Sequence, residues 1–311
     1  MTQATDAADL RTALRGSAAR RRRERTVRTI LLSAGLASVA ISAFIVVTLI
    51  VDALRFLAAV DLSALNSAGW APRRGLFDLP TLLIGTFLVS GIAMLVATPI
   101  GLFSAIFLAE YASPRTRSFV KPILEILAGI PSIVLGFFAI AVISPEIVQR
   151  INPQASGFNI LAASIAVGIL SIPLVASVSE DAMRAVPRSL REASYGLGAR
   201  RLTTSMRVVF PAAISGIVAA LILATSRAIG ETMVVALAAG ASGSGARSFD
   251  IFNVGQTLTA AMASLAIGSD RVRGDDLAFP SLFFVGAVLF VITLLLNVIG
   301  DAFVRRTRQR Y

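Results

Sequence analysis

Six long apolar stretches, separated by more polar segments, dominate the pattern of hydrophobic and polar positions along the chain. Each is close to or longer than the ~20 residues that an α-helix needs to cross a bilayer. The predicted spans are residues 29–51, 82–109, 119–143, 160–178, 208–240 and 281–304. The second, third and fifth are long, so we expect them to tilt or to extend beyond the lipid. The pattern predicts an all-α integral membrane protein with six transmembrane helices.

The spans divide the chain into four regions. Residues 1–28 form a basic N-terminal tail that we expect to be cytoplasmic and disordered. Residues 29–80 hold the first helix and an outer loop, residues 81–304 the main transmembrane domain, and residues 305–311 a second basic tail. Arginines precede the first apolar run, as they do in a signal peptide. That run is too long for a signal peptide and no convincing cleavage site ends it, which favours an uncleaved anchor.

The distribution of basic residues predicts the orientation. Of the 29 Lys and Arg residues, twenty-one fall in the two tails and in the loops after the second and fourth spans. Seven fall on the opposite side, and Arg227 lies within the fifth span. Because basic residues concentrate on the cytoplasmic side of membrane proteins, we expect both termini in the cytoplasm.

Composition excludes several classes of function. Charged residues make up 15% of the chain and hydrophobic residues 56%, which is far too apolar for a soluble domain of 311 residues. The net charge of +11 does not indicate nucleic-acid binding, because the basic residues lie beside apolar spans. The chain has no Cys or His and no glycine-rich phosphate loop, so we expect no metal site, and ATP hydrolysis would belong to another chain.

The loop at residues 192–211 is basic, is interrupted by glycines, and divides into two short helical pieces. Its order of Glu192-Ala193, Gly198 and a later Phe-Pro closely resembles the "EAA" loop of ATP-binding-cassette (ABC) importer permeases. In that family the loop forms a coupling helix that sits in a groove of a cytoplasmic ATPase. The resemblance implies that Glu192, Ala193, Gly198, Arg200 and Arg201 contact such an ATPase. An amphipathic helix lying on the membrane surface is the alternative interpretation.

Two charged residues, Arg227 and Glu231, lie inside the fifth apolar span. An ionised group at the centre of a bilayer costs ~2.5–3.5 kcal/mol on insertion scales, so a structural or functional role must account for both charges. Four residues apart, they fall on one helix face, close enough to pair. The pair could serve helix packing alone. Alternatively, the Arg227 guanidinium binds an anion in a translocation pathway, since its planar fork suits tetrahedral oxyanions.

The string at residues 226–233 looks like the "RAxGET" signature of phosphate-specific ABC permeases, and residues 129–138 resemble a second string of that family. The Met233-Val234 that follows Gly-Glu-Thr favours the C-type subunit over the A-type. The resemblance covers most of the chain from Leu79 onward. It implies a type I ABC importer permease fold and import of inorganic phosphate, with Arg227 and Glu231 as the transport-critical pair.

The same resemblance implies the other subunits of the transporter. A second homologous permease of the A-type, two cytoplasmic ATPase subunits that bind ATP and Mg, and an extracytoplasmic phosphate-binding protein would join this chain in the bacterial plasma (inner) membrane. We expect no cofactor in this chain itself and no nucleic-acid partner. The long outer segments at residues 52–80 and 241–280 would suit docking of the binding protein, although flexible connectors fit the sequence as well.

Gly129 and Pro131 should kink the third span, and Pro173 the fourth. Such breaks are tolerated only against protein or a water-filled cavity, which makes Ser132 a candidate for the lining of a pathway. Three further hydroxyl residues are candidates on the same grounds: Thr86, Ser90 and Ser171. Each could equally donate a hydrogen bond to its own helix.

Three other functions compete with phosphate import. A permease for another oxyanion, sulfate or molybdate, would have the same architecture. An ion-coupled secondary carrier would show inverted halves around broken helices, and we find no convincing internal repeat. A membrane anchor or sensor scaffold would leave the intramembrane Arg227 and Glu231 unexplained.

Overall fold

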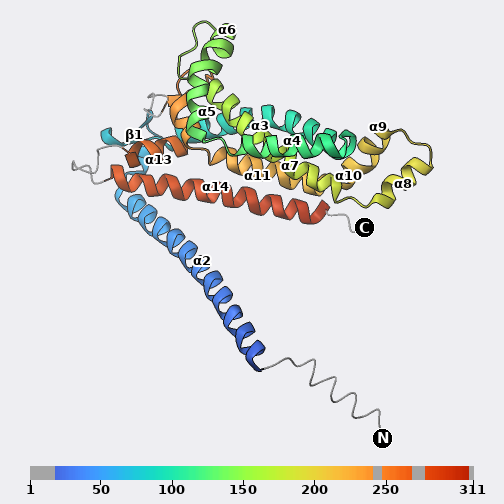
Figure 1. Ribbon diagram of the computed structural model, residues 1–311. Coiled ribbons are helices and arrows are strands. Elements are labelled where there is room, and N and C mark those ends of the chain that lie inside the picture. The colour runs from blue at the N-terminus through green and yellow to red at the C-terminus, as the bar shows by residue number, and fades with distance from the viewer. Residues whose placement is uncertain (1–17, 241–246, 268–276, 308–311) are drawn as a thin grey trace. The chain divides into compact units, whose positions relative to one another are not determined.

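The computed structural model describes residues 18–240, 247–267 and 277–307, and it is built almost entirely of helices (Figure 1). The long helices are α2 (Ala18–Ala59), α3 (Leu79–Ile106), α4 (Pro114–Ala128), α7 (Ile160–Arg184), α11 (Ile214–Ile229) and α14 (Ala278–Thr307). Five helices are long and apolar enough to cross a membrane, and a bent pair of helices makes a sixth. The prediction of an all-α membrane protein is confirmed.

The chain divides into a unit that ends at Val51 and a second unit that begins at Asp52. Helix α2 crosses this boundary, and its apolar stretch contains the predicted first span. It begins at Ala18, so residues 18–28 of the predicted disordered tail are helical, while residues 1–17 lie outside the described residues. In the second unit, Phe56 from the end of α2 is fully buried against Phe77 and Phe284.

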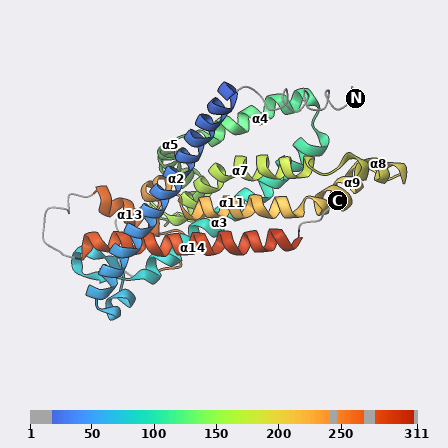
Figure 2. The same cartoon turned by 90° about the horizontal axis from the view of Figure 1, so that it is seen from below.

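The core of the second unit is a bundle in which α3, α7, α11 and α14 run side by side (Figures 1 and 2). Helices α3 and α7 approach closely because small residues line their contact. A Cβ atom on Gly101 of α3 would lie 2.7 Å from Val175 of α7, and one on Gly168 of α7 would lie 2.9 Å from the Ala93 carbonyl oxygen. Lipid tails are as apolar as leucine, so helix packing in a membrane depends on such close contacts.

Short elements connect the long helices. The short helices are α5 (Ser132–Phe138), α6 (Gln149–Ile151), α8 (Arg188–Gly196), α9 (Arg201–Thr204), α10 (Phe210–Ala212), α12 (Met233–Val235) and α13 (Leu258–Ile267). Wider π-helical turns are η3 (Phe107–Tyr111), η4 (Ala139–Val148), η5 (Ser205–Val209) and η6 (Ala236–Gly240). The remaining pieces are the 3-10 turns η1 (Leu62–Asn66) and η2 (Pro72–Arg74) and the strands β1 (Trp70–Ala71) and β2 (Leu76–Phe77).

The predicted third span, residues 119–143, is not one helix. The kink at Gly129 and Pro131 is confirmed, because α4 ends at Ala128 and α5 begins at Ser132. The span itself is displaced: the continuous segment long and apolar enough to cross a membrane runs from Ser132 to Ile151. Helix α4 is only 15 residues long and carries Arg117 and Lys121, so it is too short to count as a spanning helix by itself.

The predicted fifth span, residues 208–240, is broken twice. Helical segments Arg201–Ala212 and Ile214–Ile229 meet at a bend of 69°, next to Pro211, whose nitrogen cannot donate a backbone hydrogen bond. Helix α11 then ends at Ile229, and the chain continues through α12 and η6 to Gly240. The remaining predicted spans coincide with α2, α3, α7 and α14. Helices α2 and α14 extend past both predicted bounds and α7 past its predicted end, while α3 starts earlier than predicted and ends at Ile106, where η3 continues to Tyr111.

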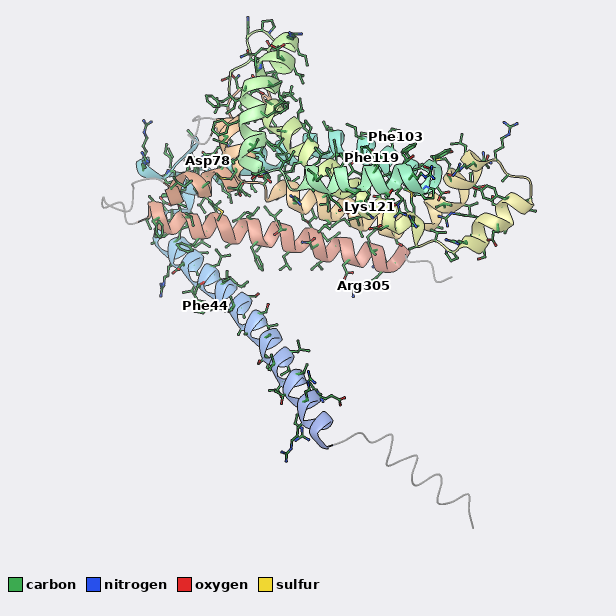
Figure 3. The ribbon with its side chains drawn as sticks, in the orientation of Figure 1. Phe44, Asp78, Phe103, Phe119, Lys121 and Arg305 are labelled. Atoms are coloured by element: carbon green, nitrogen blue, oxygen red, sulfur yellow. The ribbon has the colours of Figure 1, made fainter. Side chains whose placement is uncertain are left out.

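At one end of the bundle, the antiparallel strands β1 and β2 pair Trp70 with Phe77 beside a buried ion pair. Asp78, labelled in Figure 3, is fully buried. Arg247 Nη2 lies 2.7 Å from its Oδ1 atom. Burial acts to raise the pKa of Asp78, but hydrogen bonds from Arg247 and Thr81 outweigh it and hold the pKa below its usual value. This pair fastens the segment that precedes α13 to the start of α3.

The outer surface of the bundle is apolar along its length. Phe103 of α3 and Phe119 of α4 both point away from the bundle, and each is largely exposed (Figure 3). Surfaces of this kind face lipid or another apolar chain in membrane proteins.

The close approach of α3 and α7 gives a test of the packing. Gly101→Leu should lower the free energy of unfolding by about 1–3 kcal/mol, because the new side chain overlaps Val175. The measurement is the thermal unfolding midpoint of the purified chain in detergent. Gly91→Leu is the matched control, since Gly91 lies on the same helix with open space around it. Equal loss of stability in both variants would contradict the packing described for Gly101.

Candidate translocation and coupling sites

Arg227 lies in the last turn of α11, two residues before the helix ends. Its side chain is exposed at the surface of the chain, although the helix around it is strongly apolar. Among the residues that the structure describes, none forms a hydrogen bond or an ion pair with its guanidinium. An arginine in such a span needs a partner or water, so this one is free to bind a group from outside the chain.

Glu231 does not pair with Arg227, contrary to the prediction that both lie on one helix face. Helix α11 ends at Ile229 and Gly230 follows it, so the two side chains are not one helical turn apart. The Glu231 carboxylate instead lies 3.5 Å from the Val234 amide at the start of α12, and its carbonyl accepts a hydrogen bond from the Thr259 hydroxyl. The contacts of Glu231 therefore stabilise the turn between α11 and α12.

A polar residue of α14 adds to the surface around Arg227. Ser226 Oγ and Asn297 Oδ1 are 3.0 Å apart, which joins α11 to α14. Asn297 is exposed, and the hydrogen bond to its oxygen leaves its amide nitrogen as a donor. Asn297 was not among the predicted site residues, although a lone amide side chain between leucines and valine in a span is itself a signal of function.

The two helix breaks that carry the family-like strings lie close to each other. Helix α5 packs against α12, and a Cβ atom on Gly136 would lie 2.9 Å from Leu237 and 3.3 Å from the Val234 backbone. Ser132 stands at the first position of α5 and is half-buried, and its hydroxyl makes no hydrogen bond with any described residue. The fold thus brings segments about a hundred residues apart in the sequence to one place, beside the end of α11.

The other three candidate lining residues are structural. Thr86 donates to the Leu82 carbonyl, Ser90 to the Thr86 carbonyl and Ser171 to the Val167 carbonyl, each at 2.8 Å and each fully buried. Thr86 Oγ1 also accepts the Leu258 amide at the start of α13. Each hydroxyl thus donates to a carbonyl of its own helix, which is the alternative to a pathway lining that the sequence left open.

The predicted coupling loop forms α8 and α9 at one end of the bundle (Figure 1). Between them Gly198 has a φ of 76°, a left-handed conformation that favours glycine. The predicted contact residues Glu192, Ala193, Arg200 and Arg201 are all exposed. Leu197 is 90% exposed, which leaves an apolar side chain open to a partner at the tip of the loop.

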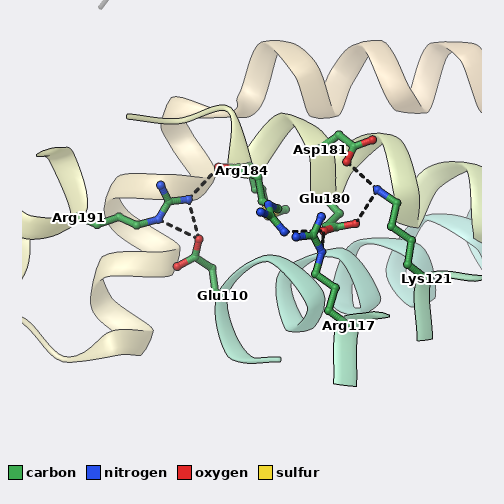
Figure 4. A network of polar contacts seen from close by, with 8 residues as sticks. Glu110, Arg117, Lys121, Glu180, Asp181, Arg184 and Arg191 are labelled. Atoms are coloured by element: carbon green, nitrogen blue, oxygen red, sulfur yellow. Dashed lines mark hydrogen bonds and ion pairs between the residues drawn. The ribbon is translucent and has the colours of Figure 1, made fainter. Parts of the chain in front are cut away.

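Arg191 fastens α8 to two membrane helices (Figure 4). Its Nη2 and Nε atoms lie 2.9 and 3.2 Å from Oε1 of Glu110, which is buried in η3 at the end of α3. It also donates to the carbonyls of Met183 and Val186 at the end of α7, both at 2.8 Å. Four hydrogen bonds from one side chain therefore join α8, α7 and the end of α3.

Glu180 holds α4 against α7 in the same network (Figure 4). Its side chain is fully buried, with Arg117 Nε 2.6 Å from Oε1 and Lys121 Nζ 3.3 Å from Oε2. Lys121 also lies 2.8 Å from Asp181, and Arg184 Nη1 lies 3.8 Å from Glu180. The Arg117 contact is an ion pair by distance rather than a well-aligned hydrogen bond.

This network of ion pairs was not predicted from the sequence. Its carboxylates, Glu110 and Glu180, stand at the ends of apolar stretches, which is the one signal that distinguishes them. Their partners cannot be identified from spacing, because Arg191 is 81 positions from Glu110. Only the packing of α3, α4 and α7 brings the charges together.

Comparison with known proteins identifies a family. The sequence model of the family described as "Binding-protein-dependent transport system inner membrane component" matches residues 97–309. A phosphate transport system permease protein PstC 1 of Mycobacterium bovis is 32% identical over 73% of this chain and 72% of its own length. A phosphate transport system permease protein PstC of Mesorhizobium japonicum is 30% identical over 86% of this chain and 85% of its own.

Another relative, the probable ABC transporter permease protein YqgH of Bacillus subtilis, is 36% identical over 57% of each chain. Among solved structures, an inward-facing form of the MetNI methionine ABC transporter aligns with a TM-score of 0.56 at 20% identity, covering 74% of this chain and 97% of that one. A bacterial ABC transporter that imports alginate also aligns with a TM-score of 0.56, at 14% identity, covering 80% and 88% of the two chains. At these identities the structures show a shared fold.

The contacts of Arg191 predict that it restrains α8. Arg191→Ala should speed amide hydrogen exchange in Arg188–Gly196 by about tenfold or more, because it removes four hydrogen bonds and leaves Glu110 buried without its counterion. Exchange is measured by mass spectrometry on the chain in detergent. Arg207→Ala is the control, since Arg207 is an exposed cation that pairs with no described residue.

A double-variant cycle sharpens the test. Glu110→Ala and Arg191→Ala together should cost less stability than the sum of the two single changes, because the second change removes the partner that the first left unpaired. Additive costs, or exchange in α8 that Arg191→Ala leaves unchanged, would show that the pair does not hold the helix.

Proposed function

Because the chain belongs to the family of binding-protein-dependent transport system inner membrane components, we propose that it is the permease subunit of an ATP-driven importer that carries inorganic phosphate into the cell. A permease subunit of an ABC transporter is not itself catalytic. The energy would come from ATP and Mg bound by separate ATPase subunits, and this chain would need no cofactor.

The environment of Arg227 is the observation that supports phosphate as the transported substrate. Arg227 presents an exposed guanidinium at the end of an apolar helix, with no counterion among the described residues. The neighbouring Ser226 hydroxyl donates to Asn297, whose amide nitrogen remains available as a donor. A guanidinium fork suits the oxygens of phosphate, and its charge offsets part of the cost of bringing that anion into a membrane. Two relatives of similar length are named as phosphate transport system permease proteins, which supports the same cargo.

We propose that a second permease of the A-type covers the exposed face of α11 and completes the pathway. A charged side chain does not face lipid stably, so this face needs another chain or water against it. Glu231 and Ser132 would line the pathway at the two helix breaks. Breaks in spanning helices that meet inside a membrane are suited to a pathway, because irregular backbone there must lie against protein or water.

Two further partners complete the proposal. One of the two cytoplasmic ATPase subunits would bind the loop formed by α8 and α9, with Leu197 as an apolar anchor and Glu192, Ala193, Gly198, Arg200 and Arg201 around it. An extracytoplasmic phosphate-binding protein would dock on the opposite side. With both termini in the cytoplasm of a bacterium, closure of the ATPases would push α8, and Arg191 would carry that movement to α7 and α3.

Import of sulfate or molybdate is the second candidate, since either anion would also fit a guanidinium. Competition separates the candidates: excess sulfate or molybdate should leave uptake of labelled phosphate unchanged. An ion-coupled carrier is disfavoured, because the family and the exposed coupling loop both indicate a partner ATPase.

Arg227→Ala tests the pathway. Phosphate uptake into proteoliposomes containing the whole complex should fall by about tenfold to a hundredfold, the equivalent of losing charge-assisted hydrogen bonds of about 1.5–3 kcal/mol. Assembly and basal ATPase activity should remain. Thr225→Ala is the control, because the Thr225 hydroxyl bonds only to the Leu221 carbonyl of its own helix. Normal uptake by an assembled Arg227→Ala complex would reject the assignment of this residue.

Leu197→Asp tests the coupling loop. The change places a charge where we expect apolar contact with the ATPase, so the amount of ATPase that copurifies with the permease should fall severalfold. The permease alone should keep its unfolding midpoint, because Leu197 touches almost nothing within the chain. Leu62→Asp is the matched control: Leu62 is also exposed but lies in η1, at the other end of the bundle. Full copurification with the Leu197 variant would count against α8 and α9 as the docking loop.

A further inference from the structure

A pocket of about 350 Å³ lies where η3, α4, α7 and α8 meet, at the end of the bundle that carries the coupling loop. Four arginines line it, one or two from each of α4, α7 and α8: Arg117, Arg184, Arg188 and Arg191. Ala112 and Pro114, at the start of α4, form part of the remaining wall. Three of these arginines and the two carboxylates behind them are seen in Figure 4.

The charges around this pocket do not balance. Three of the four arginines contact a carboxylate, either Glu110 or Glu180, and Arg188 contacts none among the described residues. Two of the four positive charges therefore remain uncompensated. Lys121 adds no further excess, because Asp181 pairs with it at 2.8 Å. Four arginines held this close repel one another, and an anion between them would relieve that repulsion.

Hydrogen-bond donors are also left over. Arg191 uses four of its five N–H groups, on Glu110 and on two carbonyls. By contrast, the side chains of Arg184 and Arg188 donate no hydrogen bond to any described residue, and Arg184 lies 3.8 Å from Glu180, beyond hydrogen-bond distance. The terminal nitrogens of Arg117 are likewise unused within the described chain.

We propose that this pocket binds a phosphate group, as inorganic phosphate or as the headgroup of an anionic phospholipid. Guanidinium groups bind phosphate oxygens through paired N–H donors, and two uncompensated charges match a phosphate dianion. Basic residues that only mark the cytoplasmic side of a membrane protein extend singly toward water. Here Arg117 and Arg191 are instead held in place by buried carboxylates, which organises the site in advance.

The position of the pocket gives the ligand an effect on α8. Arg188 begins α8, whereas Arg184 and Arg117 belong to α7 and α4, so a bound phosphate group links the coupling helix to the membrane helices. An occupied site therefore restrains α8 in one position, in addition to the link through Arg191. The site is separate from Arg227 and does not depend on what that residue binds.

The test uses the complete complex in nanodiscs of phosphatidylcholine, without nucleotide or binding protein, in the Arg227→Ala background. Inorganic phosphate at constant ionic strength should slow amide exchange in Arg188–Gly196. The double variant Arg184→Ala/Arg188→Ala should need at least about tenfold more phosphate for the same effect. Arg306→Ala is the matched control, since Arg306 is an exposed arginine of α14 that does not line the pocket.

A second arm identifies the source of the phosphate group. Nanodiscs containing phosphatidylglycerol should protect α8 in the unmodified complex if a lipid headgroup is the ligand, and native mass spectrometry should then find that lipid retained. Arg184→Ala/Arg188→Ala should lose both effects. Protection by either ligand that the double variant abolishes supports the site. If neither phosphate nor phosphatidylglycerol protects α8, or if the double variant responds like the Arg306 control, the proposal is wrong.

Discussion

The fold depends on one constraint: inside a bilayer the chain has no water to satisfy its backbone groups and charges. Several helix ends among the described residues are accordingly closed by polar side chains of the chain itself. Thr259 donates to the Glu231 carbonyl that the end of α11 leaves free, and Thr86 accepts the first amide of α13. The fully buried Asn159 caps α7 by accepting the Ala162 amide at 2.7 Å. Breaks of this kind let spanning helices end and turn without exposing unpaired groups to lipid.

The same constraint accounts for the charged network beside the coupling loop. A buried carboxylate is stable only with its counterions, so Glu110 and Glu180 each require arginine or lysine from a neighbouring helix. The partners come from α4 and α8, which contact the bundle less extensively than its four main helices do. The ion pairs therefore determine where these two helices attach. As a consequence, a force on α8 reaches α7 through Arg191 and its hydrogen bonds to the carbonyls of Met183 and Val186, rather than through a flexible loop.

The local sequence pattern predicts the number of spans and one of the kinks, but not the end of α11 or the tertiary ion pairs. Span number and the kink at Gly129 and Pro131 could be predicted, because apolar length and the missing proline N–H act locally. The end of α11 at Gly230 could not, since the apolar run continues to Gly240 and glycine inside a helix costs only about 1 kcal/mol. Predicting a pair between Arg227 and Glu231 assumed an unbroken helix and was therefore wrong. Partners such as Glu110 and Arg191 meet only through tertiary packing, which spacing does not encode.

Arg227 differs from every buried charge in this chain. Of the residues that the structure describes, the three buried carboxylates, Asp78, Glu110 and Glu180, all have arginine counterions. Arg227 has none, although it lies in the kind of segment where an unpaired charge is most costly. The buried carboxylates are thus all paired within the chain, whereas the exposed Arg227 has no counterion among the described residues. Arg227 is exposed on α11 rather than enclosed by the bundle. Its position therefore favours a pathway that lies between this chain and a second chain, with the Arg227 guanidinium on this chain's wall of the pathway.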